Sequence, residues 1–251
     1  MTEEVNIEIK IKEIERKLEE GEITLAEALK KLNALKGEYI KTIQKVKRHI
    51  KDPEQSWHSF IGKKFEKIIF NALKGYIEIL KKKYPEFQGL VALTDKDITN
   101  KREYEVIFRK LAVKYGEYLL LPDTDIVIAD YNSSNPWESK VLAIVSCKTS
   151  LRERIAQSCY WKLKLLSSDV TKHVKVYLVT RDNDEDFALN YDRKQHYGGK
   201  SRNRIIAEYE LDGIYIVRDK FPKEWENEKV KRYDKLFHDL LDLIKDGVSR
   251  S

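Results

Sequence analysis

Residues 122–148 read PDTDIVIADYNSSNPWESKVLAIVSCK, and the fold prediction rests on this stretch. One apolar run follows directly after two aspartates, and a second, at 140–148, ends in a lysine. The turn between them is rich in Asn, Ser and Pro, which is typical of two neighbouring strands. The second run is apolar at nearly every position, which predicts a strand buried on both faces. Such a pair brings the aspartates and the lysine to one edge of a sheet.

Helices and further strands are expected on both sides of this pair. The apolar spacing predicts a core helix at 54–84, a short strand at 89–94 and a helix at 102–116. Residues 118–131 are rich in strand formers. Downstream we expect a helix at 151–166, a strand at 173–182, a polar loop at 182–204, strand–turn–strand at 205–219 and an amphipathic helix at 230–247. This order predicts an α/β fold with a central mixed β-sheet flanked by helices.

The N-terminal region, residues 5–51, is predicted to be helical and rich in Lys and Glu. Thr24 is a candidate N-cap, and Glu27 stands where a capping box requires it. Asp52-Pro53 marks the end of this region. We therefore expect an N-terminal helical appendage at 1–52, which serves in dimerisation or as a DNA clasp, and a catalytic and DNA-recognition domain at 53–251.

The composition narrows the class of protein. The chain carries 48 Lys+Arg against 42 Asp+Glu, a net charge of +6. This excess is compatible with nucleic-acid binding, and equally with a surface of mixed Lys and Glu. The two cysteines, Cys147 and Cys159, have no neighbouring pair or histidine that would indicate zinc, and their use fits a reducing compartment. The charged N-terminus is unlike a signal peptide, and the lack of an 18-residue apolar run predicts no membrane span.

Asp125 and Lys148 are the residues most suited to chemistry. A carboxylate can hold Mg²⁺, and the metal lowers the pKa of a bound water. A nearby ammonium orients that water and offsets developing negative charge. The main-chain carbonyl of Cys147 is a further candidate ligand. Asp123 is the alternative acid, but Pro-Asp also makes turns, and Asp125 directly precedes the apolar strand.

This arrangement resembles the PD-(D/E)XK nuclease superfamily. Residues 147–154, CKTSLRER, resemble the segment after the catalytic lysine in restriction endonucleases of the CCGG/CCNGG group. The resemblance implies that Arg152, Glu153 and Arg154 read G·C pairs in the major groove, as Arg does with guanine and Glu with cytosine. Ser-Trp at 56–57, GKKFE at 62–66 and LDGIYIV at 211–217 resemble segments of BsaWI-type enzymes.

The chain departs from the group's pattern at the second acid. Ser146 replaces an acid on the strand, and no acid lies between Arg154 and Asp169 on the following helix. Glu66 is the best substitute, although it could equally be a surface residue paired with Lys63 or Lys67. Gln157 is a candidate for holding a metal-bound water or contacting DNA.

The basic loop at 193–204 is the second candidate DNA contact. Its cations suit the DNA backbone, and the alternative is a plain surface loop. The candidates are Lys194, Lys200, Arg202 and Arg204.

The resemblance implies a type II restriction endonuclease that cuts double-stranded DNA with Mg²⁺ at a short palindromic G·C-containing site. It also implies a homodimer, a cognate DNA methyltransferase and a prokaryotic cytoplasm. Two alternatives stay open. One is a PD-(D/E)XK nuclease of repair or junction resolution with little sequence preference, and the other is a non-catalytic DNA-binding protein with a decayed nuclease site.

Overall fold

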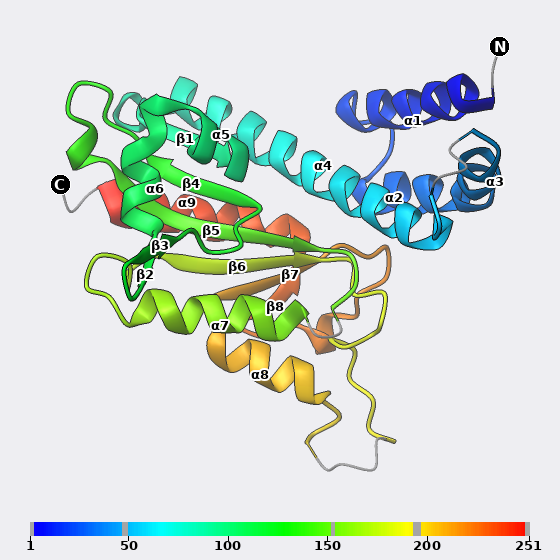
Figure 1. Ribbon diagram of the computed structural model, residues 1–251. Helices are drawn as coiled ribbons and strands as arrows, with labels where there is room; N and C mark the ends of the chain where they lie inside the picture. Colours follow the sequence, from blue (N-terminus) through cyan, green and yellow to red (C-terminus); the bar gives the residue numbers. More distant parts are fainter. Residues whose placement is uncertain (1–2, 47–49, 152–153, 193–196, 249–251) are drawn as a thin grey trace.

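The computed structural model describes residues 3–46, 50–151, 154–192 and 197–248. Its centre is a six-stranded sheet in the order β1-β4-β5-β6-β7-β8 (Figure 1). The strands are β1 (Leu90–Thr94), β4 (Ile126–Asp130), β5 (Lys140–Lys148), β6 (Lys175–Thr180), β7 (Gly213–Ile216) and β8 (Val230–Arg232). β1, β4 and β5 pair antiparallel, whereas β5 to β8 run parallel. The predicted mixed sheet is therefore confirmed.

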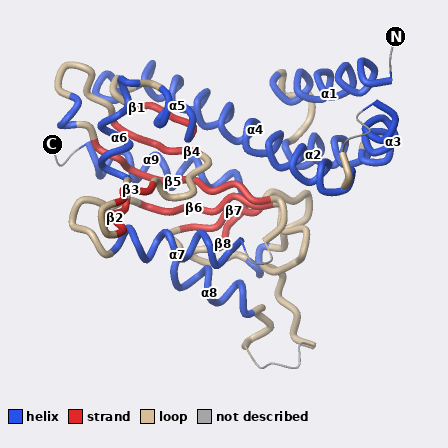
Figure 2. Tube along the Cα trace, in the orientation of Figure 1, coloured by secondary structure: helices blue, strands red, loops and turns tan. Residues whose placement is uncertain are grey.

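Helices cover both faces of this sheet, as Figure 2 shows. One face packs against α4 (Pro53–Lys83) and α9 (Leu236–Val248), and the other against α5 (Asp95–Asn100), α6 (Glu105–Leu111), α7 (Arg154–Leu166) and α8 (Arg202–Glu210). The apolar residues of β4 alternate between the two cores, with Ile126 and Ile128 in one and Val127 and Ala129 in the other. The predicted α/β class with flanking helices is confirmed. None of the described helices is long and apolar enough to cross a membrane.

Three further helices gather around the N-terminal half of α4 (Figure 1). They are α1 (Glu3–Glu19), α2 (Leu25–Ala34) and α3 (Lys36–Val46). Thr24 and Glu27 form the predicted capping box of α2, and Asp52 caps α4. Leu29 and Leu32 of α2 are fully buried and belong to the same apolar cluster as Phe65 of α4. The helical appendage and the sheet therefore share one core.

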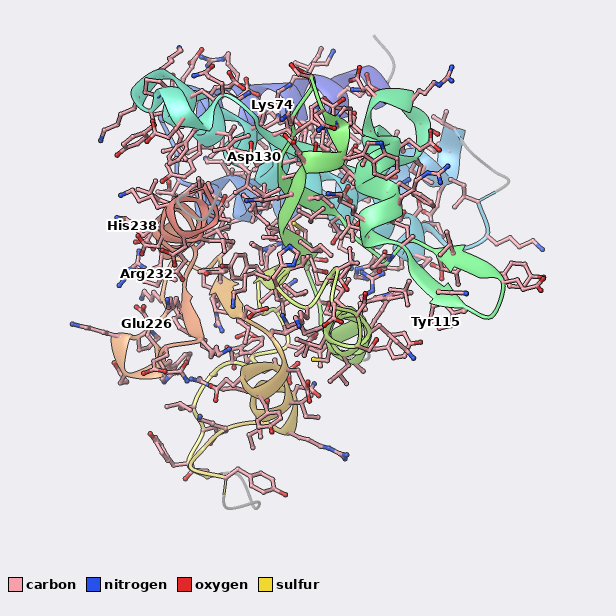
Figure 3. All side chains as sticks on the ribbon, turned by 90° about the vertical axis from the view of Figure 1, so that its left-hand side faces the viewer. Lys74, Tyr115, Asp130, Glu226, Arg232 and His238 are labelled. Carbon is pink, nitrogen blue, oxygen red and sulfur yellow. The ribbon has the colours of Figure 1, made fainter. Side chains whose placement is uncertain are left out.

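The structure corrects several boundaries. Helix α6 ends at Leu111, and β2 (Val113–Tyr115) follows and pairs with β3 (Tyr118–Leu120) in a separate two-stranded sheet. Tyr115 (labelled in Figure 3) ends β2, and its hydroxyl reaches α7, 2.6 Å from that of Tyr160. Residues 118–131 are therefore two strands in different sheets, which the continuous pattern of strand formers concealed. Likewise β8 precedes α9 in the segment expected to be one helix.

The expectation of strand–turn–strand at 205–219 was wrong in its first half. Ser201 caps helix α8, which occupies 202–210, and only β7 is a strand. The buried positions of α8 are Arg204 and Ala207, three residues apart, so its inward face pairs an arginine with one small apolar residue. A short apolar run such as Ile205-Ile206 does not by itself distinguish a helix from a strand.

Short 3₁₀ helices connect these elements at Pro85–Phe87, Arg102–Tyr104, Pro136–Glu138, Lys223–Trp225 and Tyr233–Lys235.

Candidate active site

The register of β4 and β5 places Asp125 beside the end of β5. Ile126 pairs with Val145, so the chain before Ile126 lies opposite the residues that follow Val145. The Asp125 carboxylate oxygen Oδ2 lies 3.0 Å from the Lys148 ammonium and accepts the main-chain N–H of Cys147 at 2.5 Å. The Ser146 hydroxyl lies 3.4 Å from the same oxygen. The structure thus brings together the carboxylate and the lysine that the sequence singled out.

Burial distinguishes the two aspartates. The side chain of Lys148 is 8% exposed and that of Asp125 is 14% exposed, whereas Asp123 is 45% exposed. A buried ammonium requires a paired anion, and Asp125 supplies it. Asp123 approaches the Lys148 nitrogen only to 3.7 Å, from the solvent side. Asp125 is therefore the anchored acid of this site, and Asp123 is a peripheral one.

Glu66 reaches the site from α4, on the face of the sheet that this helix covers. Burial raises the pKa of its carboxyl group, the negative charge of Asp125 raises it further, and Lys148 acts in the opposite direction. Glu66 also contributes to the raised pKa of the buried Cys147 thiol, after burial and Asp125. No ion pair joins Glu66 to Lys63 or Lys67, all three of which are described. The carboxyl group of Glu66 therefore lies within the electrostatic field of Asp125 and Lys148.

Asp95 is a residue near the site that the sequence interpretation missed. Thr94 pairs with Ile126, so β1 delivers Asp95 to the same edge of the sheet as Asp125. The charge of Asp95 raises the pKa of Glu66, and that of Lys96 lowers it. The only sequence signal was an acid directly after a short strand. It could not be used without knowing that β1 lies beside β4.

The donor set fits a small, hard cation. Carboxylate and main-chain carbonyl oxygens suit Mg²⁺, which is usually held by one or two carboxylates with water and phosphate completing its octahedron. The Cys147 N–H faces Asp125, and in an extended strand the N–H and C=O of one residue point to the same side, so its carbonyl faces Asp125 too. Within the described residues, no group of three or more His, Cys, Asp or Glu side chains gathers closely enough to hold a metal by itself.

Comparison with known proteins decides the family. The family model described as BsaWI restriction endonuclease type 2 matches residues 98–239, more than half of the chain. The chain belongs to this family of type II restriction endonucleases. It is therefore an enzyme, a site-specific deoxyribonuclease whose substrate is DNA. Both Asp125 and Lys148 lie within the matched span, whereas Glu66 lies before it.

Two relatives support the assignment. A putative type II restriction enzyme, MjaVIP of Methanocaldococcus jannaschii, is 39% identical over 194 residues, which cover 76% of this chain and 78% of the relative. A probable type II restriction enzyme, HpyAORF263P of Helicobacter pylori, is 37% identical over 161 residues, which cover 63% and 77%. No solved structure matches the chain.

The helix after the candidate catalytic lysine of this BsaWI-family chain is anchored to the sheet and exposed on its outer side. Arg152 and Glu153 lie outside the described residues. Arg154 and Gln157 are exposed, one turn apart on α7. The inward side carries Ser158, whose hydroxyl lies 3.4 Å from that of Ser146 on β5. The fold thus presents Arg154 and Gln157 to solvent close to the active-site strand.

The basic loop differs from the expectation. Lys194 lies outside the described residues, and Arg202 is exposed. Lys200 is half-buried and ion-paired with Glu208. Arg204 is only 1% exposed, and its guanidinium donates to the Glu208 carboxylate and to the main-chain carbonyls of Phe187 and Trp225. Because Ser201 caps the start of α8, Arg204 falls on the inward face of the helix, where it is buried and bonded within the protein.

Proposed function

We propose that this enzyme is a Mg²⁺-dependent type II restriction endonuclease of the PD-(D/E)XK kind, with Asp125, Lys148 and Glu66 at its centre. The observation that carries the proposal is the 3.0 Å contact between Asp125 and Lys148 at the edge of the sheet. A buried pair of this kind provides a cation ligand and a fixed ammonium at one place, and Glu66 adds a second carboxyl group whose pKa Asp125 raises. Family membership supplies the class of reaction.

Each residue has a distinct role in this proposal. Asp125, Glu66 and the carbonyl of Cys147 would hold the ion, which supplies Lewis acidity and a more acidic water. Lys148 positions the attacking water and offsets negative charge on the phosphoryl oxygens. The hydrogen bonds from Cys147 N–H and Lys148 fix the Asp125 carboxylate before substrate arrives. Asp123, being exposed, supplements the negative charge at the mouth of the site.

We propose that base pairs are recognised by residues just before and at the start of α7. Arg152, Glu153 and Arg154 would contact G·C pairs of a short palindrome, since Arg bonds guanine O6 and N7 and Glu accepts from cytosine N4. The exposure of Arg154 and Gln157 supports this assignment for the described part of the segment. Lys194, Arg202 and Lys200 are proposed to contact the backbone, with Lys200 the least available because Glu208 holds it.

The proposed assembly follows from the substrate. A palindromic site has two-fold symmetry, so we propose a homodimer that places one active site on each strand. A nuclease that cuts a short sequence also endangers its host's DNA. We therefore propose a cognate DNA methyltransferase as a partner system, in the cytoplasm of a prokaryote.

The function is tested by incubating the purified protein with a plasmid in Mg²⁺, with an EDTA lane beside it. We expect discrete fragments that disappear when EDTA removes the metal, and mapping their ends gives the recognition site. A smear in place of fragments would indicate a nuclease without sequence preference. A shifted band on a gel without any cutting would indicate a DNA-binding protein with a decayed site.

Glu66→Gln is expected to slow cleavage by roughly 10-fold to 100-fold and to raise the Mg²⁺ concentration needed for half-maximal rate. The amide keeps the shape of the side chain but removes the charge that would bind the cation. The measurement is the initial cleavage rate as a function of Mg²⁺ concentration. Glu78→Gln is the matched control, because Glu78 lies on the same helix and, among the residues that the structure describes, its ion pair is with Lys81 at the surface. Equal Mg²⁺ curves for the two variants would remove Glu66 from the metal site.

A further inference from the structure

A basic cavity of about 450 Å³ lies beside the candidate active site, between helix α2 and the ends of strands β6 and β7. The wall contributed by α2 includes Lys30. The opposite wall consists of the segments that directly follow the two strands, at 181–183 and 217–220. The N-terminal helices and the sheet therefore enclose this cavity together.

The position of Arg181 shows that the cavity lies close to the edge of the sheet that carries Lys148. Thr180, the residue before it, pairs with Lys148 on one side and with Ile216 on the other. Neighbouring strands are about 4.8 Å apart, so Arg181 begins one strand away and one residue beyond the candidate catalytic lysine. Arg181 therefore starts from the same end of the sheet as the candidate catalytic lysine.

The guanidinium of Arg181 is half-buried without an anion. No hydrogen bond or ion pair joins it to any residue that the structure describes. Burial lowers the pKa of Arg181, and no carboxylate counteracts this effect. The adjacent Asp182 does not serve Arg181, because its carboxylate accepts the Phe187 N–H at 3.2 Å and lies 3.4 Å from Arg218. A partly desolvated cation without a partner is costly, and an incoming anion would relieve that cost.

The other charged residues that line the cavity indicate which kind of anion it suits. Lys30 and Lys220 are exposed at the cavity and have no ion-pair partner among the described residues. The acids of the lining are Asp182 and Asp219, and Asp182 is already engaged with Arg218. A guanidinium flanked by two ammonium groups suits the two free oxygens of a phosphodiester, which Arg binds in a fork geometry.

We propose that Arg181, flanked by Lys30 and Lys220, binds a backbone phosphate of the DNA next to the scissile one. The proposal rests on the proposed function, since it names a positioning contact for the same substrate. It also gives the N-terminal helices a place in DNA binding, because Lys30 belongs to α2. Arg181 fixes the position of the DNA strand along the protein while the residues at the start of α7 contact the bases.

The test is equilibrium binding of a fluorescent DNA duplex in EDTA at several salt concentrations, with Arg181→Gln compared with the wild type. The duplexes are the mapped recognition sequence and a scrambled one. We expect about ten-fold weaker binding to both duplexes, and a slope of log affinity against log salt that is shallower by about 0.9, the value for one lost phosphate contact. Arg109→Gln is the matched control, because Arg109 is exposed on α6 and pairs with Glu105.

Two outcomes would overturn the proposal. An unchanged salt slope in Arg181→Gln would show that Arg181 touches no phosphate. A loss confined to the recognition sequence would make it a base contact. Failure of the proposed function would be distinguishable from failure of this proposal. A wild-type protein that binds DNA but does not cut it in Mg²⁺ would refute the nuclease, while the effect of Arg181→Gln on DNA binding would still be measured.

Discussion

Replacing Lys148 by alanine is expected to lower the DNA cleavage rate by about 1,000-fold, the usual cost of losing a preorganised charge-stabilising donor. The side chain is 8% exposed and its ammonium lies 3.0 Å from Asp125, so alanine removes the fixed positive charge at this place. Without the ammonium, the attacking water loses its orienting group and the phosphoryl oxygens lose a fixed positive charge. The measurement is the single-turnover rate of plasmid cleavage at saturating Mg²⁺.

Lys172→Ala is the control for this variant, because Lys172 is 60% exposed and pairs only with Asp169 within the described residues. Circular dichroism and DNA binding in EDTA distinguish a chemical defect from an unfolded protein. We expect Lys148→Ala to bind DNA nearly as well as the wild type while failing to cut it. A variant that cuts at the wild-type rate would show that the site lies elsewhere.

The second large effect is expected at Arg204, on stability and not on chemistry. Arg204→Met removes a guanidinium that is 1% exposed, and it leaves the carbonyls of Phe187 and Trp225 without this donor. Glu208 loses its bond to Arg204 and keeps those to Lys200 and Asn227. Removing one partner of a buried ion pair typically costs 3–5 kcal/mol, and we expect a loss of about 4 kcal/mol in the free energy of unfolding. For a chain of this size this corresponds to a fall in Tm of roughly 10 °C.

Thermal and urea unfolding measure this loss. Arg202→Met is the matched control, because Arg202 lies two residues earlier on the same helix and is exposed. We expect the control to change the free energy of unfolding by less than about 0.5 kcal/mol. If Arg204→Met were as stable as Arg202→Met and instead weakened DNA binding, the basic loop would have its originally expected role and the buried anchor would be refuted.

Much of the fold could be predicted because its signals are local. The strands β4 and β5 follow from two apolar runs around a turn, and the capping box at Thr24 and Glu27 marks the start of α2. Helix α4 was readable from its apolar spacing over eight turns, and the Asp52-Pro53 step marks where it begins. Signals of this kind depend only on residues a few positions apart.

Other elements could not be predicted because their local preferences are ambiguous. Residues 205–210 contain two isoleucines and a tyrosine and read as a strand, yet Ser201 caps a helix there and Arg204 turns inward. The hairpin of β2 and β3 interrupts a continuous run of strand formers, and its pairing removes residues 118–120 from the main sheet. In both cases tertiary packing overrides propensity.

The sequence by itself determined the α/β class, the strand pair that carries Asp125 and Lys148, and the resemblance that placed the chain among restriction endonucleases. Only the tertiary structure decided which charges meet. It brought Glu66 and Asp95 toward Asp125 and buried Arg204 against Glu208. It also left Arg181, near the candidate active site, without an anion among the described residues. The physical reason is that sheet order and helix orientation set the distances between residues remote in the chain, and burial then makes a charge costly unless a partner is near.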